Sequence, residues 1–215
     1  MKKKKRQELS KSITQGMAHE SGHLIAALFL EKEVKNIEFR VLQTKTQYLF
    51  VGAIPTDREQ FKKNLEDPQK REKAILDRIA ILYAGNNAHL LLFGLNNFPG
   101  GGVEDLKEIC IILKDLVPAH RQEAVANAAA DLSWKIITEN QDKIKRVAGE
   151  LAERFKRGEN PARIEGPELE KIVGPFLPSP SREMIDLAED QILRDFVRPP
   201  VLLPYEKMRA NTGGV

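Results

Sequence analysis

Two histidines and a glutamate near the start of the chain have the spacing of a metal-dependent hydrolytic site. They lie in the segment His19-Glu20-Ser21-Gly22-His23. Residues four apart share one face of a helix, one turn above the other, so both imidazoles can reach one divalent cation. Zinc-assisted attack of water on a peptide carbonyl needs two neutral nitrogen ligands and a nearby carboxylate that does not bind the metal. We therefore expect His19 and His23 to bind Zn²⁺ and Glu20 to act as the general base.

A zinc site of this kind needs a third protein ligand, and the sequence offers several. The candidates are His89, His120, Glu104, Asp105 and Glu108. Asp105 follows a run of three glycines at 100–102, where the backbone can approach another group closely. An aspartate in the first turn of a helix is also typical of a carboxylate that caps the helix or offsets its dipole. Residue types alone therefore leave the third ligand open.

The motif needs a helix to position it, and the surrounding sequence predicts one. Residues 12–30 have apolar side chains three, four and seven apart, with Ser12 or Thr14 as the cap. We therefore expect a mainly α (α+β) fold, a helical metallopeptidase domain with a small β-hairpin or sheet after this helix. The expected strands are 34–41 and 48–54, joined by a polar turn at 43–47. Further helices are expected at 58–66, 69–93, 103–117, 120–157 (as one helix or two abutting ones) and 168–173.

Composition divides the chain into three parts. Residues 1–11 contain five consecutive basic residues at 2–6, and a block of like charge is typical of a disordered leader. Residues 12–174 hold the expected elements, and 175–215 form a Pro-rich C-terminal extension in which only 182–196 could be helical. Without the five basic residues of the leader, 29 basic residues face 31 acidic ones. This balance argues against a nucleic-acid partner.

Hydropathy and cysteine content favour a cytoplasmic location. No apolar run approaches the roughly 20 residues of a membrane-spanning helix, and no apolar signal-peptide core follows the basic start. The single cysteine, Cys110, excludes an internal disulfide. Cys110 lies in the apolar run 109–113, so we expect a buried small hydrophobe rather than a reactive thiol.

Several segments, in the same order, resemble the protease domain of the FtsH-type family, the ATP-dependent zinc metalloproteases. That family has H-E-A-G-H where this chain has H-E-S-G-H at 19–23. Its R-I-A-V-L-L-G-G-R-A-A-E-E-L-V-F-G is similar to residues 78–94, R-I-A-I-L-Y-A-G-N-N-A-H-L-L-L-F-G. Its Gly-Ala-Ser-Asn-Asp-Leu segment is similar to residues 101–106, G-G-V-E-D-L. Residues 136–151 and 163–173 resemble the long helix and the closing segment of the family.

The resemblance covers roughly residues 12–174 and implies a zinc endopeptidase of mostly helical fold. It assigns the third metal ligand to Asp105, beside His19 and His23, with Glu20 as the catalytic base. The implied substrates are unfolded or loosely folded polypeptides. A separate AAA ATPase and further copies of the same chain are the partners that the family suggests.

Two departures from the family pattern lead to alternatives. We find neither an AAA ATPase module nor a membrane anchor in the residues before His19, so we expect a stand-alone domain. His89 stands where the family has the first glutamate of A-E-E, a carboxylate that could support a zinc-binding histidine. With histidine in its place, that support is altered, or His89 approaches the metal itself. The alternatives are a non-catalytic or degenerate zinc-binding module, and a protease subunit that acts with a separate ATPase.

Overall fold

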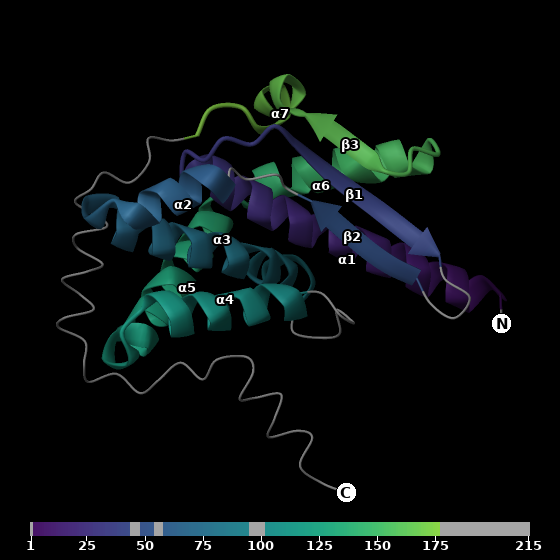
Figure 1. Cartoon of the computed structure of the whole chain (residues 1–215). Helices are drawn as coiled ribbons and strands as arrows, with labels where there is room; N and C mark the ends of the chain where they lie inside the picture. The colour runs from purple at the N-terminus through teal and green to yellow at the C-terminus, as the bar shows by residue number, and fades with distance from the viewer. Residues whose placement is uncertain (1, 44–47, 54–57, 95–101, 177–215) are drawn as a thin grey trace, which may run out of the picture. The chain divides into compact units, whose positions relative to one another are not determined.

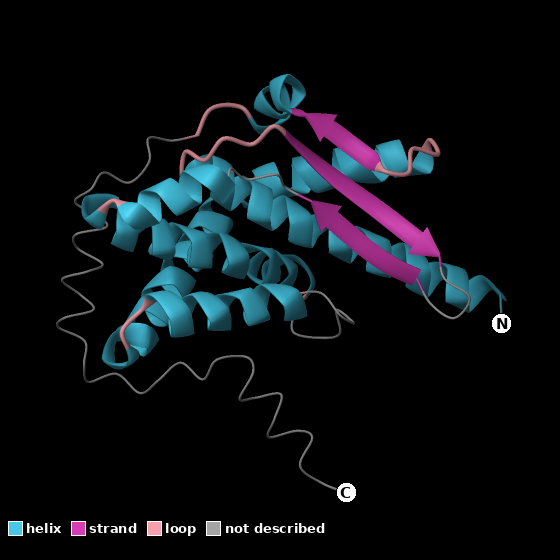
Figure 2. Ribbon diagram, viewed as in Figure 1, coloured by secondary structure: helices cyan, strands magenta, loops and turns pink. Residues whose placement is uncertain are grey.

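The computed structural model describes residues 2–43, 48–53, 58–94 and 102–176, with side chains at 11–42, 59–94 and 102–176. Helices dominate this part of the chain, and three strands form a small antiparallel sheet (Figures 1 and 2). The expected mainly α (α+β) fold is confirmed. No helix within the described ranges is long and apolar enough to cross a membrane.

The helix that carries the histidine motif, α1, runs from Lys2 to Phe29. It begins at Lys2 rather than at Ser12, so residues 2–11 are helical where the sequence predicted a disordered leader. Lysine and arginine are good helix formers, and each residue added to an existing helix gains a hydrogen bond without a new nucleation step. Between Met17 and Leu30 nearly every residue is buried. A helix buried all round lies at the centre of its fold.

A three-stranded sheet packs against α1. Its strands are β1 (Asn36–Gln43), β2 (Tyr48–Ala53) and β3 (Ala162–Glu165), in the order β2-β1-β3 with both pairs antiparallel. Ile37 and Phe39 on β1 are fully buried. The sequence predicted β1 and β2 but not β3, because four residues give too short an alternation to detect.

Six further α-helices complete the described part of the fold. They are α2 (Arg58–Glu66), α3 (Pro68–Phe93), α4 (Val103–Leu116), α5 (Gln122–Glu139), α6 (Gln141–Lys156) and α7 (Gly166–Val173). The long helical pattern at 120–157 divides at Asn140, whose side chain donates to the carbonyl of Ile136. In Figure 1 the sheet lies on one side of α1 and α4 lies beyond α3, whereas α5 contacts both α1 and α3. The α1–α3 pair is therefore the middle layer.

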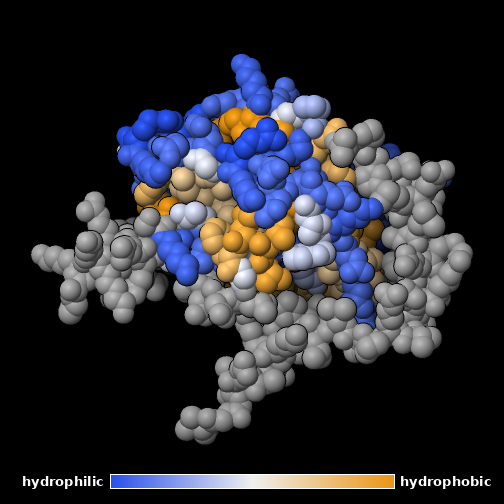
Figure 3. Space-filling view, turned by 180° about the vertical axis from the view of Figure 1, so that it is seen from behind, coloured by the Kyte–Doolittle hydropathy of each residue, from blue (hydrophilic) through white to orange (hydrophobic). Residues whose placement is uncertain are grey.

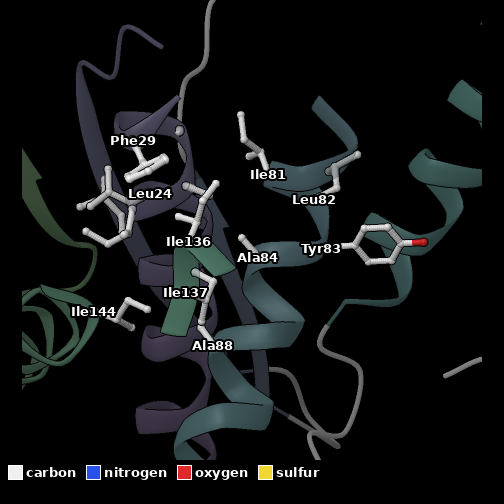
Figure 4. Close-up of a cluster of buried hydrophobic side chains, with 14 of the residues drawn as sticks. Leu24, Phe29, Ile81, Leu82, Tyr83, Ala84, Ala88, Ile136, Ile137 and Ile144 are labelled. Atoms are coloured by element: carbon white, nitrogen blue, oxygen red, sulfur yellow. The ribbon is translucent and has the colours of Figure 1, made fainter. Parts of the chain in front are cut away.

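The core lies where α1, α3, α5 and α6 meet. Figure 4 shows Leu24 of α1 and Ala88 of α3 close to Ile136 and Ile137 of α5, with Ile144 of α6 beside them. All five side chains are at most 1% exposed. Burying one large aliphatic side chain contributes about 1.5–3 kcal/mol to folding. This packing holds α1 and α3 in register, which matters below because both helices shape the candidate site.

On the face seen in Figure 3, the described residues are mostly hydrophilic, with limited apolar areas between them. Cys110 is exposed, contrary to the expectation that it would be buried. Ile109 and Ile112 of the same helix are buried, whereas Ile111 is 58% exposed. An apolar run continuous around a helix cannot all face the core when only one side of the helix is packed. Isolated exposed apolar residues are ordinary on protein surfaces, so they are no argument for a binding partner.

Several predictions concern residues outside the described ranges. These are most of the turn at 43–47, the helix at 182–196 and nearly all of the extension at 175–215.

The side chain of Asn160 continues the β1–β3 ladder. Phe39 pairs with Ala162, so Asn160 stands opposite Val41 in the same register. The amide of Asn160 accepts from the N–H of Val41 at 3.0 Å and donates to its carbonyl at 2.9 Å. The side-chain amide thus forms the two hydrogen bonds that a backbone peptide group would form in the sheet.

Replacing Asn160 by alanine should leave two polar groups of Val41 without these partners. We expect Asn160→Ala to lower the free energy of unfolding by roughly 1–3 kcal/mol. Urea denaturation followed by circular dichroism measures the change. The exposed Lys156→Ala should stay near wild type, and equal stability of Asn160→Ala and wild type would show that the amide adds nothing.

Candidate metal centre

His19 and His23 lie in the buried part of α1, with side chains 4% and 10% exposed. Their Nε2 atoms are 3.0 Å apart, and the two rings are perpendicular. Nδ1 of His23 lies 2.7 Å from the carbonyl oxygen of Ile81 in α3, to which it donates its proton. In a neutral imidazole this hydrogen bond leaves Nε2 as the atom with the free lone pair. His23 is therefore fixed in the tautomer that can bind a cation through Nε2.

Asp105 completes the cluster from the first turn of α4. Its Oδ2 lies 3.1 Å from Nε2 of His19 and 3.2 Å from Nε2 of His23. With the 3.0 Å between the nitrogens, the three atoms form a nearly equilateral triangle. Three linear hydrogen bonds cannot form around so small a triangle, because each N–H points in a single direction. Three electron-pair donors this close are held together best by a cation, and the group could hold a metal ion.

Two glycines let the histidine helix approach α3. A Cβ at Gly85 of α3 would lie 2.6 Å from Cε1 of His23 and 2.7 Å from Cε1 of His19. On α1, Gly22 lies about one turn after His19, and a Cβ at Gly22 would lie 2.6 Å from the Cβ of Ala88 in α3. Both distances are too short for a side chain. The imidazole rings therefore rest directly on the α3 backbone, which places the Ile81 carbonyl within reach of His23.

The start of α4 is shaped to bring Asp105 to the rings. Gly102 is the N-cap residue, with φ +82° and ψ −2°, a left-handed conformation that favours glycine. Its carbonyl accepts the first helical hydrogen bond, from the N–H of Leu106 at 3.0 Å. Asp105 thus lies in the first turn, where the helix dipole stabilises a carboxylate.

Contacts within the cluster shift the pKa values of His23 and Asp105. Burial lowers the pKa of His23, but the contacts with Asp105 and the charge of Glu20 outweigh burial and raise that pKa to about 9. Burial would raise the pKa of Asp105, yet hydrogen bonds from His19 and His23 hold it well below its usual range. A proton on His23 therefore stabilises the cluster without a metal, and a metal ion must displace that proton.

Glu20 adjoins the cluster but is not part of it. It follows His19 on α1 and is half-buried. Burial raises the pKa of its carboxyl, an effect that the charges of His23 and His19 partly offset. A carboxyl with a raised pKa is suited to accept a proton and return it near neutral pH. Its placement fits the role of a base beside the ligands.

Most other candidate ligands lie away from the cluster. Glu104 is exposed and pairs with Lys107, and Glu108 forms an ion pair with Arg78. His120 is exposed in a short 3₁₀ segment. Of the five candidates left open by residue type, the structure brings only Asp105 into the metal-binding group, as far as the described residues extend.

His89 lies one helical turn after Gly85 but outside the ligand group. It is 8% exposed, and its ring packs against Phe93 with centroids 5.6 Å apart. Burial lowers the pKa of His89, and the charges of His19 and Lys11 lower it further. His89 is therefore a neutral neighbour of the site and not a substitute for the carboxylate that the family pattern has there.

Two parts of the site were not identified from the sequence. The Ile81 carbonyl is a backbone group, which no residue type signals. Gly85 falls within a segment used for the family resemblance, but only the structure shows that both rings rest on it.

A scan against models of known protein families finds no match, and neither does a search of curated proteins. The resemblance to FtsH-type protease domains therefore rests on the quoted segments alone.

The raised pKa of His23 predicts how metal affinity depends on pH. One proton must leave His23 when the ion binds, so the apparent affinity should rise by about tenfold per pH unit and level off above the pKa of about 9. Competition titration with Zn²⁺ and a chromophoric chelator, corrected for the protonation of the chelator, measures this.

Asp105→Ala is the matched variant, because it removes the main cause of the raised pKa. Its weaker binding should level off at lower pH than in the wild type. A wild-type affinity that does not change between about pH 7 and about pH 9 would contradict a proton on metal-free His23.

Proposed function

We propose that the protein is a zinc-dependent endopeptidase that hydrolyses peptide bonds in unfolded or loosely folded proteins. The observation that carries the proposal is the 3.0–3.2 Å triangle of Nε2 of His19, Nε2 of His23 and Oδ2 of Asp105. Glu20, with its raised pKa, adjoins this triangle. Two imidazoles, one carboxylate and a non-ligand glutamate are the side chains that such hydrolysis requires.

The donor set and its spacing fit zinc and disfavour magnesium and calcium. Zinc binds imidazole nitrogen and carboxylate oxygen at about 2.0–2.2 Å, and tetrahedral ligands at such bond lengths lie about 3.3–3.6 Å apart. The three ligand atoms lie 3.0–3.2 Å apart, so they need to move apart only slightly to bind zinc. Magnesium and calcium prefer oxygen ligands, so two histidines out of three ligands disfavour them. With three protein ligands, a fourth position stays open, as in catalytic zinc sites.

Each of these residues would have its own role in hydrolysis. Zinc held there would polarise the scissile carbonyl and activate a water molecule. Glu20 would accept the proton that the water loses and deliver a proton to the leaving nitrogen. The bond from Nδ1 of His23 to the Ile81 carbonyl would keep that ring oriented, and Asp105 would stay ionised because its pKa is low.

The recessed position of these groups supports extended substrates. His19 and His23 are nearly buried, and the Asp105 side chain is 21% exposed. A folded domain presents no strand thin enough to reach such a site, whereas a single extended segment can. This supports unfolded or loosely folded chains as the substrate class.

One observation favours a second candidate function, a zinc-binding module without peptidase activity. The neutral, buried His89 stands where the family has a carboxylate. Without that charge, a zinc-binding histidine is less basic, and the rate of hydrolysis could be lost while binding persists. A protease subunit that depends on a separate ATPase would have the same site and would need that partner to unfold its substrates.

Zinc content tests the ligand set directly. We expect about one zinc ion per chain in the wild type and at least about a tenfold loss of zinc affinity in Asp105→Ala. Glu104→Ala is the matched control, because Glu104 is the neighbouring exposed carboxylate and pairs with Lys107. Atomic absorption after dialysis against a weak chelator gives the measurement. Equal zinc in Asp105→Ala and wild type would remove Asp105 from the site.

Substitution of Glu20 tests catalysis separately from metal binding. Glu20→Gln keeps the size of the side chain but cannot accept a proton, so casein hydrolysis should fall by about 10²–10⁴-fold while zinc content stays unchanged. Fluorescent casein and zinc analysis on the same samples provide both readouts. A zinc-loaded wild type that cleaves no unfolded substrate would instead support the non-catalytic module.

A further inference from the structure

The amide of Asn86 in α3 lies against the backbone of Gly102, where α4 begins. A Cβ built at Gly102 would lie 2.6 Å from Cγ of Asn86 and closer still to its Oδ1 and Nδ2. Gly102 is buried and has a φ of +82°. Glycine alone provides both this backbone conformation and the space that the amide occupies. The contact is therefore specific to this pair of residues.

Asn86 directly follows Gly85, whose backbone supports the two imidazole rings. Two consecutive residues of α3 therefore contact the two separate halves of the site, the rings from α1 and the start of α4. The backbone of a packed helix is rigid, so α3 fixes the distance between these halves. A metal site requires its ligands to be held within about 0.5 Å of the productive geometry.

We propose that Asn86 is a positioning residue for Asp105: its amide fixes Gly102, and through the first turn of α4 it keeps the Asp105 carboxylate within reach of His19 and His23. This inference rests on the proposed function as a metal site. The Gly102 carbonyl accepts from Leu106 at 3.0 Å, so Gly102 and Asp105 belong to the same first helical turn. A shift of Gly102 therefore moves Asp105 with it.

Other contacts hold α4 but lie after Asp105. Arg78 of α3 donates to Glu108 at 3.0 Å and 2.5 Å, and Ile109 and Ile112 are buried against the core. These contacts keep α4 folded and packed when Asn86 is changed. Loss of the Asn86 amide therefore frees the first turn without unfolding the helix, and the effect falls on Asp105.

The test compares Asn86→Ala with Asn87→Ala by competition titration with Zn²⁺. Asn87 is the matched control, because its Nδ2 donates to Ser133 of α5, rather than to a residue of α4, at 2.9 Å. Zinc affinity should fall about 10–100-fold in Asn86→Ala and stay within about threefold of wild type in Asn87→Ala. The visible absorption of bound Co²⁺ should change in Asn86→Ala alone. Wild-type affinity in Asn86→Ala, or an equal loss in Asn87→Ala, overturns the proposal.

A double-mutant cycle with Asp105→Ala shows whether Asn86 acts through Asp105. In the Asp105→Ala background, Asn86→Ala should change zinc affinity by less than about threefold, since the residue that it positions is already gone. The same fold loss in both backgrounds would mean that Asn86 acts on the site by another route, and the proposal would be wrong. If Asn86→Ala does not fold by circular dichroism, Asn86→Ser takes its place with the same criteria.

Hydrogen exchange separates this inference from the proposed function. If wild-type protein binds no zinc, the metal proposal fails, but the amides of Asp105 and Leu106 can still be measured in the metal-free chain. Faster exchange there in Asn86→Ala and not in Asn87→Ala supports the positioning role. Unchanged exchange in Asn86→Ala overturns that role, whatever the outcome of the zinc measurements.

Discussion

The close contact between α1 and α3 is the constraint on which the site depends. Gly22 and Gly85 remove the side chains that would separate the two helices, so both imidazoles meet a bare stretch of α3 backbone. The same approach brings the Ile81 carbonyl within 2.7 Å of His23 and settles which ring nitrogen faces the cluster. The apolar packing of α1, α3 and α5 maintains the approach, so the core and the candidate site are parts of one arrangement.

Electrostatics explains why this cluster differs from the exposed ion pairs of the described residues. Pairs such as Lys62 with Glu59 are exposed and contribute little to stability. Asp105, in contrast, is largely buried between the rings of His19 and His23, so its negative charge needs a positive charge beside it. A buried charge without a partner is strongly unfavourable. Either a proton or a metal ion must neutralise it, and the two compete for the same atoms.

The sequence predicted local features well and tertiary ones poorly. The bounds expected for the helix at 58–66 agree with α2, because periodicity is a local property. Residue types alone could not choose Asp105 among five candidates, since its partners are 86 and 82 positions away and come together only through α3. Similarly, β3 is defined by its pairing with β1. The exposure of Cys110 depends on which side of α4 packs against the rest of the protein. Residues 2–11 are helical because continuation from an existing helix outweighs repulsion between like charges.

A bond from His19 to Asp105 joins residues 86 positions apart. A single ion shared by these side chains would close a long loop of the chain, as a disulfide does. Loop closure stabilises a fold mainly by restricting the unfolded chain, and the effect grows with loop length. Thermal stability would then depend on the free concentration of the ion, by mass action. The ion would serve as a removable cross-link, and a chelator would act on the whole fold as well as on the site.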